Sequence, residues 1–251
     1  MKPPPRVIAG NREELNKAMK AIFSRVPQRS QQDEATDIFA RLRATPPKQE
    51  RSLQTLNRLL DAAEKVLEEE GLDATTVPVI AKRAGVSVGV VYRRFPNKDA
   101  LIRGVYERFL WRVNEQNSMM LGTLNRVQFT LQDLLRGMIR GSVEGHRRKR
   151  NLLRALHQFA RTHSDPAMKR EAAKMNRAST AAITALMLAH QEKIRHPDPE
   201  AAIQFAVLTL AAVIRSAILD EEGTSGLSGP DDIEEELTRM IVGYLGIDER
   251  L

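Results

Sequence analysis

Apolar residues recur at intervals of three and four along almost the whole chain. This spacing places them on one face of an α-helix, whereas the alternation of apolar and polar residues that marks a half-buried strand is scarce. The pattern therefore predicts an all-α protein built from amphipathic helices.

Residues 1–50 are predicted to form an N-terminal extension. Prolines interrupt it at positions 3–5, 27 and 46–47, and the apolar residues between them fall on two short helical faces. We expect two short amphipathic helices or a partly disordered segment here. The two prolines at 46–47 mark the boundary with the next segment.

Residues that start and end helices alternate closely after this extension. Gly71 falls where a first helix, beginning near Ser52, should end. Thr76 can cap a second helix, Val77–Ala84, and Gly85 can end it in the left-handed conformation. The sequence therefore predicts a long helix followed by a very short one.

A third helix follows after a turn. Ser87 can cap this helix, Val88–Phe95, which Pro96 stops, and Asn97 can cap a fourth. Two short helices joined by a three-residue turn have the spacing of a helix-turn-helix. The apolar residues that would pack this pair against the first helix are Ile80, Ala81, Val86, Val91 and Phe95. We therefore predict a three-helix DNA-binding domain over residues 51–103.

The outward face of the third helix carries residues that a packed core does not require. Gly89 costs about 1 kcal/mol of helix stability relative to alanine, but it lets another backbone come close. Val90 can contact a thymine methyl group, and Tyr92 can donate to a phosphate. Arg94 can reach either a guanine or a phosphate. The candidate DNA-binding residues are Thr76, Ser87, Val88, Gly89, Val90, Tyr92, Arg93, Arg94 and Lys98.

The charge along the chain favours an anionic partner for this segment. The net charge is +7, and no acidic residue lies between Asp73 and Asp99. The five basic residues in that gap are Lys82, Arg83, Arg93, Arg94 and Lys98. A solvated helical surface would explain the charge alone, but the turn and the caps favour nucleic-acid binding. A second basic run, His146–Arg150, is assigned to a solvated helix end.

Residues 56–105 resemble the DNA-binding domain of the TetR family of bacterial transcriptional regulators. The residues that carry the resemblance are Ala62, Ala63, Gly71, Thr76, Ile80, Ala81, Ala84, Gly85, Val86, Ser87, Gly89, Tyr92, Phe95, Lys98 and Leu101. The resemblance implies phosphate contacts for Thr76, Tyr92 and Lys98. It implies contacts with bases or the groove wall for Val88, Val90 and Arg94. Pro78, Val88 and Arg94 depart from the residues common in the family, which leaves the base preference open.

Catalytic and metal-binding motifs are absent from the sequence. Cysteine is absent, and His157/His163 and His190/His196 are each six residues apart, which does not place both rings on one helical face. We expect no catalytic residue, no metal, no cofactor and no enzyme activity. No apolar run approaches the ~20 residues that span a bilayer, and the start of the chain lacks the pattern of a signal peptide. These features predict a cytoplasmic protein without a membrane partner.

Residues 104–251 are predicted to form a helical effector-binding and dimerisation domain. The segment 199–219 is apolar nearly all round and rich in alanine. The resemblance implies that the last two helices pair with their copies in a homodimer, as a four-helix bundle. Candidate interface residues are Phe205, Ala212, Ile233, Leu237, Met240 and Tyr244. Burial within one subunit is the alternative for these side chains.

The resemblance also implies a small-molecule effector. Candidate pocket residues are Met119, Phe129, Met138, His157, Phe159 and Met175. A methionine-containing pocket suits an apolar molecule, and ordinary core packing is the alternative for each residue.

The leading hypothesis is a dimeric repressor that binds an inverted-repeat DNA operator. Binding of the effector should displace the DNA-binding domain through the fourth helix, which links the two domains, and so release the operator. The alternative is a DNA-binding structural or division-associated factor without a small-molecule effector.

Overall fold

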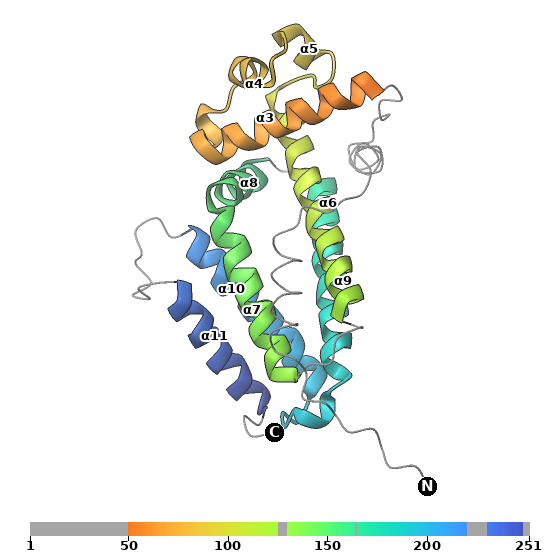
Figure 1. The fold of residues 1–251 in the computed structure, drawn as a ribbon, viewed down its shortest axis with the longest axis vertical. Helices are drawn as coiled ribbons and strands as arrows, with labels where there is room; N and C mark the ends of the chain where they lie inside the picture. The colour runs from red at the N-terminus through yellow and green to blue at the C-terminus, as the bar shows by residue number, and fades with distance from the viewer. Residues whose placement is uncertain (1–49, 125–129, 164, 220–229, 248–251) are drawn as a thin grey trace. The chain divides into compact units, whose positions relative to one another are not determined.

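The computed structural model describes residues 50–124, 130–163, 165–219 and 230–247 (Figure 1). Helices account for every regular element within these ranges, so the all-α prediction is confirmed. The elements are α3 (Glu50–Ala74), α4 (Val77–Ala84), α5 (Val88–Tyr92), α6 (Lys98–Leu124), α7 (Leu131–Arg148), α8 (Arg150–Thr162), α9 (Pro166–Leu188), η1 (Gln191–Lys193), α10 (Pro199–Leu219) and α11 (Pro230–Leu245). The predicted extension 1–50 lies outside the described residues, apart from its last position.

Apart from the gaps just named, the described residues form two compact units that alternate along the chain. The helix-turn-helix unit contains residues 50–115 and 149–175, and the α10–α11 unit contains residues 116–148 and 176–247. The helices α6 and α9 contribute to both units. The division into consecutive domains at residue 103 stays a prediction from the sequence.

Two glycines and a threonine set the helix ends in the helix-turn-helix unit as predicted. Gly71 breaks the helical path of α3 with a φ of 77°, which only glycine adopts without strain. The Thr76 hydroxyl accepts a hydrogen bond of 3.4 Å from the Val79 amide and so caps α4. Gly85 ends α4 with a φ of 66°.

The third helix departs from its prediction in two ways. It ends at Tyr92 rather than at Phe95, because residues 93 and 94 continue as a turn before Pro96. The Ser87 side chain makes no capping hydrogen bond, and its carbonyl instead accepts from the Val90 amide at 2.9 Å. The Asn97 cap is confirmed, since its side-chain oxygen accepts from the Ala100 amide at 2.8 Å.

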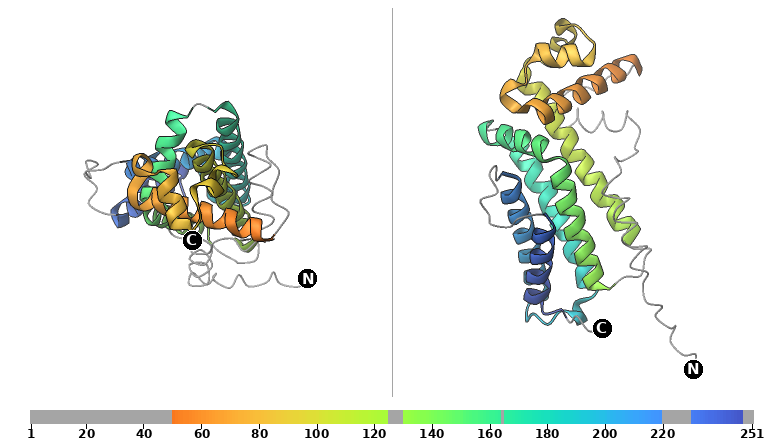
Figure 2. Two further views of the ribbon diagram at one scale, coloured as in Figure 1. Left: turned by 90° about the horizontal axis from the view of Figure 1, so that it is seen from above. Right: turned by 60° about the vertical axis from the view of Figure 1, so that its left-hand side comes forward.

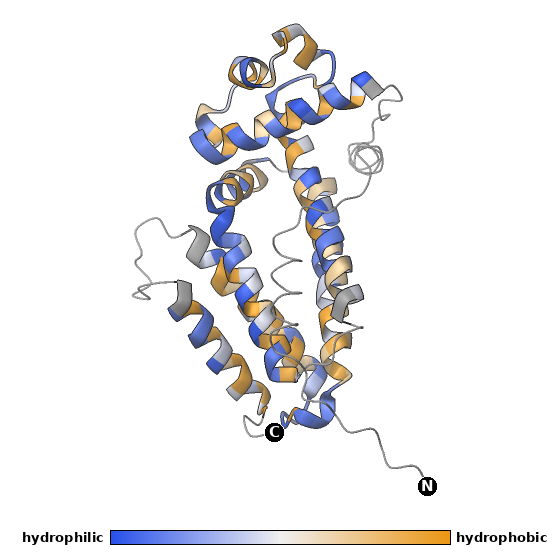
Figure 3. Ribbon diagram, viewed as in Figure 1, coloured by the Kyte–Doolittle hydropathy of each residue, from blue (hydrophilic) through white to orange (hydrophobic). Residues whose placement is uncertain are grey.

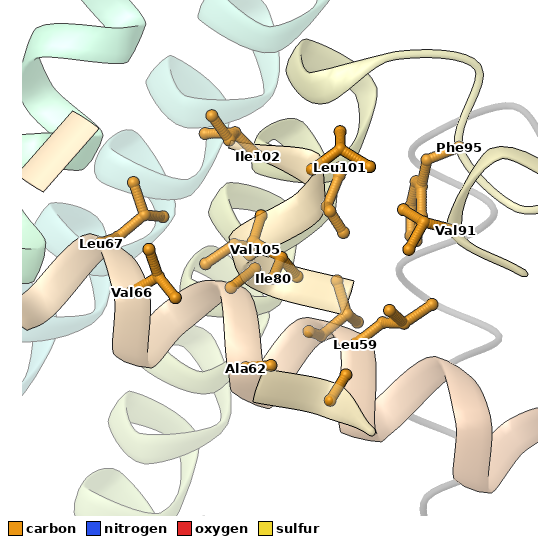
Figure 4. Close-up of a cluster of buried hydrophobic side chains, with 14 of the residues drawn as sticks. Leu59, Ala62, Val66, Leu67, Ile80, Val91, Phe95, Leu101, Ile102 and Val105 are labelled. Carbon is orange, nitrogen blue, oxygen red and sulfur yellow. The ribbon is translucent and has the colours of Figure 1, made fainter. Parts of the chain in front are cut away.

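The core of this unit holds the short helices in place (Figure 4). Val91 of α5 and Phe95 are buried against side chains of α3 and α6, and Ile80 of α4 packs into the same core. The same core continues into α8, whose buried members are Leu152, Ala155, Leu156 and Phe159. In Figure 1, α3 therefore lies between α4–α5 on one side and α8 on the other. The position of the turn thus depends on packing across both faces of α3.

A buried arginine adds a charged cluster beside this core. Arg108 of α6 is buried and donates to Asp61 Oδ1 at 2.7 Å and to Glu64 Oε2 at 2.6 Å. Glu64 also contacts Arg112 Nη1 at 3.0 Å and Lys149 Nζ at 3.8 Å. Burial alone would raise the pKa of the Glu64 carboxyl, but the surrounding cations and the hydrogen bond from Arg108 hold it below its usual value.

In the α10–α11 unit, α7, α10 and α11 pack against one another (Figure 2). Hydrophobic residues recur along both α10 and α11 (Figure 3). The window Pro199–Ser216 has a mean hydropathy of 1.2, so α10 could cross a membrane by length and composition. This differs from the prediction that no apolar run approaches the length that spans a bilayer. Only 22% of this window is buried in the described part of the chain.

Candidate nucleic-acid interface

The helix α5 is one-sided, with a single buried residue. Val91 packs into the core, while Val88, Gly89, Tyr92 and the adjoining Arg93 are exposed. Tyr92 is 52% exposed, although its neighbours Val91 and Phe95 are buried. A short helix that is anchored on one side presents the remaining sides to a groove of its partner.

The surroundings of Gly89 in the described part of the chain leave room for a side chain. An alanine side chain at this position would contact only the Ser87 hydroxyl, at 3.9 Å. Alanine stabilises a helix interior by about 1 kcal/mol relative to glycine, and Gly89 is the second residue of the five-residue α5, so alanine would fit here at no steric cost. The open space beside residue 89 leaves room for a surface that approaches α5 from outside.

Lys98 is partly engaged within the chain. Its ammonium group donates to the Leu72 carbonyl at 3.0 Å, which joins the start of α6 to the end of α3. A lysine has three donors, so two remain for an anion. The sequence pattern contained no signal for this contact, because the two residues lie 26 positions apart.

Arg94 is also anchored within the chain. Its Nη2 donates to the Ser52 hydroxyl of α3 at 2.9 Å. Burial lowers the pKa of the Arg94 guanidinium, and the charge of the neighbouring Arg93 lowers it further. Arg93 itself is exposed, so it presents its charge directly to solvent.

Acidic residues around this surface are engaged by other side chains. Arg83 of α4 contacts Glu69, and it lies 4.0 Å from Glu70. The Asp99 carboxylate lies 3.2 Å from His163 Nε2. The exposed positive charge therefore remains concentrated between α4 and the end of α5.

The remaining candidate positions have mixed surroundings. Thr76 and Ser87 are exposed at the two helix starts, and Val90 is half-buried. Among the candidate pocket residues, Met138 and Phe159 are buried, while Met119, His157 and Met175 are half-buried. Phe129 lies outside the described residues. These six residues belong to different parts of the chain, and their role in a pocket stays a prediction.

An exposed apolar patch covers α10 and α11. It consists of Phe205, Leu208, Met240 and Tyr244, which are 54%, 65%, 45% and 41% exposed. The Phe205 and Tyr244 rings lie 5.6 Å apart, and the His196 ring lies 5.1 Å from Tyr244. Leu208 was missing from the interface residues chosen from the sequence.

The other candidate interface residues differ in their exposure. Ala212 is exposed, Ile233 is half-buried and Leu237 is buried within the chain. The sequence pattern gave the apolar positions of α11 but not which of them face inward.

Three helices pack together here, and the second helix of the helix-turn-helix, α5, is buried on one side and flanked by cations on the other. These features define a DNA-binding helix-turn-helix protein. Residues 59–105 match the family model for bacterial regulatory proteins of the tetR family. Residues 130–245 match the model for the tetracyclin repressor-like C-terminal domain. The chain belongs to the TetR family and is a DNA-binding transcriptional regulator.

Two named relatives match about a third of the chain. The nucleoid occlusion factor SlmA of Vibrio cholerae is 35% identical over 82 residues, which cover 31% of this chain and 42% of SlmA. The transcriptional repressor KstR of Rhodococcus jostii is 33% identical over 85 residues, covering 33% of this chain and 40% of KstR. The chain thus spans about two fifths of the length of these curated relatives.

Solved structures with low sequence identity share the fold. A putative TetR-family regulator from Mesorhizobium loti has a TM-score of 0.59 at 20% identity, covering 79% of this chain and 98% of its own. The fatty acid degradation regulator FadR of Bacillus halodurans has a TM-score of 0.57 at 18% identity, covering 77% and 97%. A SmeT–triclosan complex has a TM-score of 0.55 at 20% identity, covering 78% and 93%.

Proposed function

We propose that the protein is a cytoplasmic, homodimeric repressor that binds an inverted-repeat operator and is released by an apolar small molecule. The observation that carries the DNA-binding part is the exposed face of α5, where Gly89 lies in open space beside Tyr92 and Arg93. An operator-bound repressor blocks transcription while the effector is scarce, so release by a small molecule provides the regulation.

In this proposal some residues contact DNA directly, and others hold the turn in position. Gly89 lets the helix enter the major groove, Tyr92 donates to a phosphate, and Arg93 supplies an exposed cation. Lys98 and Arg94 fix the turn on α3, and their remaining donors reach phosphates or a guanine. Thr76 and the first amides of α4 meet a second phosphate.

Dimerisation is supported by the spacing of exposed residues on α10. Ala201, Phe205, Leu208, Ala212 and Arg215 are exposed at intervals of four and three, the spacing of a helix–helix seam. The patch residues of α11 extend this surface. A two-fold pair presents two copies of α5 to half-sites at least about one helical turn, ~34 Å, apart.

The small-molecule effector is supported by family membership and by the SmeT–triclosan complex among the structures that share the fold. Such a molecule releases the operator only if it binds one arrangement of the two α5 copies better than another. The helix α6 is suited to transmit the change, because it begins at Lys98 beside the turn and continues into the α10–α11 unit.

A second candidate function is a division-associated DNA-binding factor without an effector. The observation that favours it is the 35% identity with SlmA, which is named a nucleoid occlusion factor. Many genomic sites and DNA binding that no apolar molecule weakens would favour this function over the repressor.

A footprint of genomic fragments with the purified full chain tests the proposal. We expect a protected, two-fold symmetric site upstream of a gene, and release by at least one member of a panel of apolar small molecules. A footprint over a single half-site would contradict the dimer. Equal binding of every fragment would contradict an operator.

A further inference from the structure

A half-open groove of about 640 Å³ lies between α7 and α11. Both helices belong to the α10–α11 unit. Its lining contains none of the candidate pocket residues and none of the candidate DNA-binding residues. The groove therefore has no role in the function proposed above.

Arginines of α7 dominate one wall of this groove. Arg136, Arg140 and Arg147 line it from positions that are one and three helical turns apart, so they share one face of the helix. Arg140 Nε donates to Glu234 of α11 at 2.9 Å. This pair leaves Arg136 and Arg147 as the arginines of α7 without an anionic partner among the described residues.

Arg136 has the greater need of a partner. Its Nε is buried and has no hydrogen-bond acceptor within the described part of the chain. A buried donor without an acceptor destabilises a structure, and a charged donor does so more strongly. An anion in the groove would supply the missing acceptor, and the guanidinium fork matches the two oxygens of a carboxylate or a phosphate.

The rest of the lining restricts the body of the ligand. Val143 and Val242 contribute apolar surface beside the arginines, and Thr238 is buried on the α11 side. The remaining Arg239 is already engaged by Glu235 and Glu236. Three carboxylates, Glu144, Glu234 and Glu235, also line the groove, so its charge is mixed. The feature that favours an anion is therefore the unsatisfied donor of Arg136, with apolar side chains near it.

We propose that this groove binds a small organic oxyanion, with its carboxylate or phosphate on Arg136 and its apolar body against Val143 and Val242. The two sources of the oxyanion share the same recognition chemistry. The site differs from a DNA-phosphate contact, because it also requires an apolar body. It is separate from the apolar effector of the proposed repressor, and neither depends on the other.

Calorimetric titration of the full chain with 2-naphthoate and with phenyl phosphate tests this site. Saturable binding of at least one of them is expected below about 10 mM, and the stronger of the two identifies the class of oxyanion. The neutral isostere 2-naphthamide should bind at least tenfold more weakly. Equal binding of the amide, or no saturable heat from either anion, would overturn the proposal.

Two variants locate the anion. Arg136→Gln should weaken binding at least tenfold, whereas Arg177→Gln, which removes an exposed arginine of α9 outside the groove lining, should bind within about threefold of the original. Unfolding curves show whether each variant is folded. If Arg136→Gln is unfolded, Arg136→Lys replaces it as the test, and it should bind more weakly than the original chain but still measurably, because it keeps the positive charge. Unchanged binding by a folded Arg136→Gln would contradict the assignment.

Discussion

The exposed face of α5 and the apolar patch of α10–α11 have opposite chemistry. The first presents a glycine, a tyrosine hydroxyl and cations, and the second presents two aromatic and two aliphatic side chains without charge. A surface that meets a polyanion keeps favourable contact with water when it is free. A large exposed apolar patch does not, and such patches mark interaction sites. The two surfaces therefore suit the two partners of the proposed function, DNA for α5 and a second copy of the chain for α10–α11.

The largest expected effect comes from a charge in the apolar patch. Phe205→Asp should convert the dimer to a monomer and lower operator affinity about 100-fold, roughly 2.7 kcal/mol, because one α5 then binds instead of two. Sedimentation and gel-shift measurements check the two results. Ala181→Asp, on an exposed position of α9, is the matched control and should change neither. An intact dimer for Phe205→Asp would contradict the proposal that the apolar patch is the dimer interface.

Gly89→Ala should act on α5 with opposite signs in two measurements. Operator affinity should fall at least about tenfold, because the added methyl group separates α5 from DNA, while the free energy of unfolding rises by up to about 1 kcal/mol. Gly122→Ala is the matched control, since an added methyl group there meets nothing within 4 Å and at residue 89 meets only the Ser87 hydroxyl at 3.9 Å. It should stabilise the fold without changing DNA affinity. Unchanged operator binding by Gly89→Ala would contradict the close approach.

Lys98→Ala and Tyr92→Phe should separate positioning from direct contact. Each should weaken binding to all DNA sequences by roughly 1 kcal/mol. Only Lys98→Ala should also lower the melting temperature, because it removes the hydrogen bond to the Leu72 carbonyl. Equal melting temperatures for the two variants would show that this bond does not stabilise the turn.

Arg94→Ala should have the smallest effect on affinity but should report on base reading. If a donor of Arg94 reaches a guanine, selection of binding sites from random DNA should lose preference at one position of each half-site. An unchanged preference with weaker binding would assign the remaining donors to phosphate.

Local signals in the sequence were sufficient for the helix ends around the turn. Gly71, Thr76, Gly85 and Asn97 act where the pattern places them, because caps and left-handed glycines depend on neighbours within a few residues. Ser87 is the exception, since its backbone carbonyl rather than its hydroxyl meets the next turn.

Contacts between distant segments could not be predicted in the same way. The bonds of Lys98 to Leu72 and of Arg94 to Ser52 join positions 26 and 42 residues apart. Helical periodicity likewise gave Leu237 and Met240 as apolar positions of α11. It did not reveal that one is buried and the other exposed, since this depends on which neighbours α11 packs against. The packing of α8 on α3 was not predicted for the same reason, since it joins helices that are far apart in the sequence.

The Glu64 carboxylate has a consequence for how this protein can diverge from its relatives. One side chain neutralises cations on α6 and at the start of α8, and it does so from α3. Loss of that acid leaves the buried Arg108 with Asp61 as its remaining acidic contact, and loss of Arg108 leaves Glu64 with Arg112 and Lys149. A single exchange here should therefore weaken the cluster without leaving a buried charge wholly unpaired, so these positions can change one at a time at a moderate loss of stability.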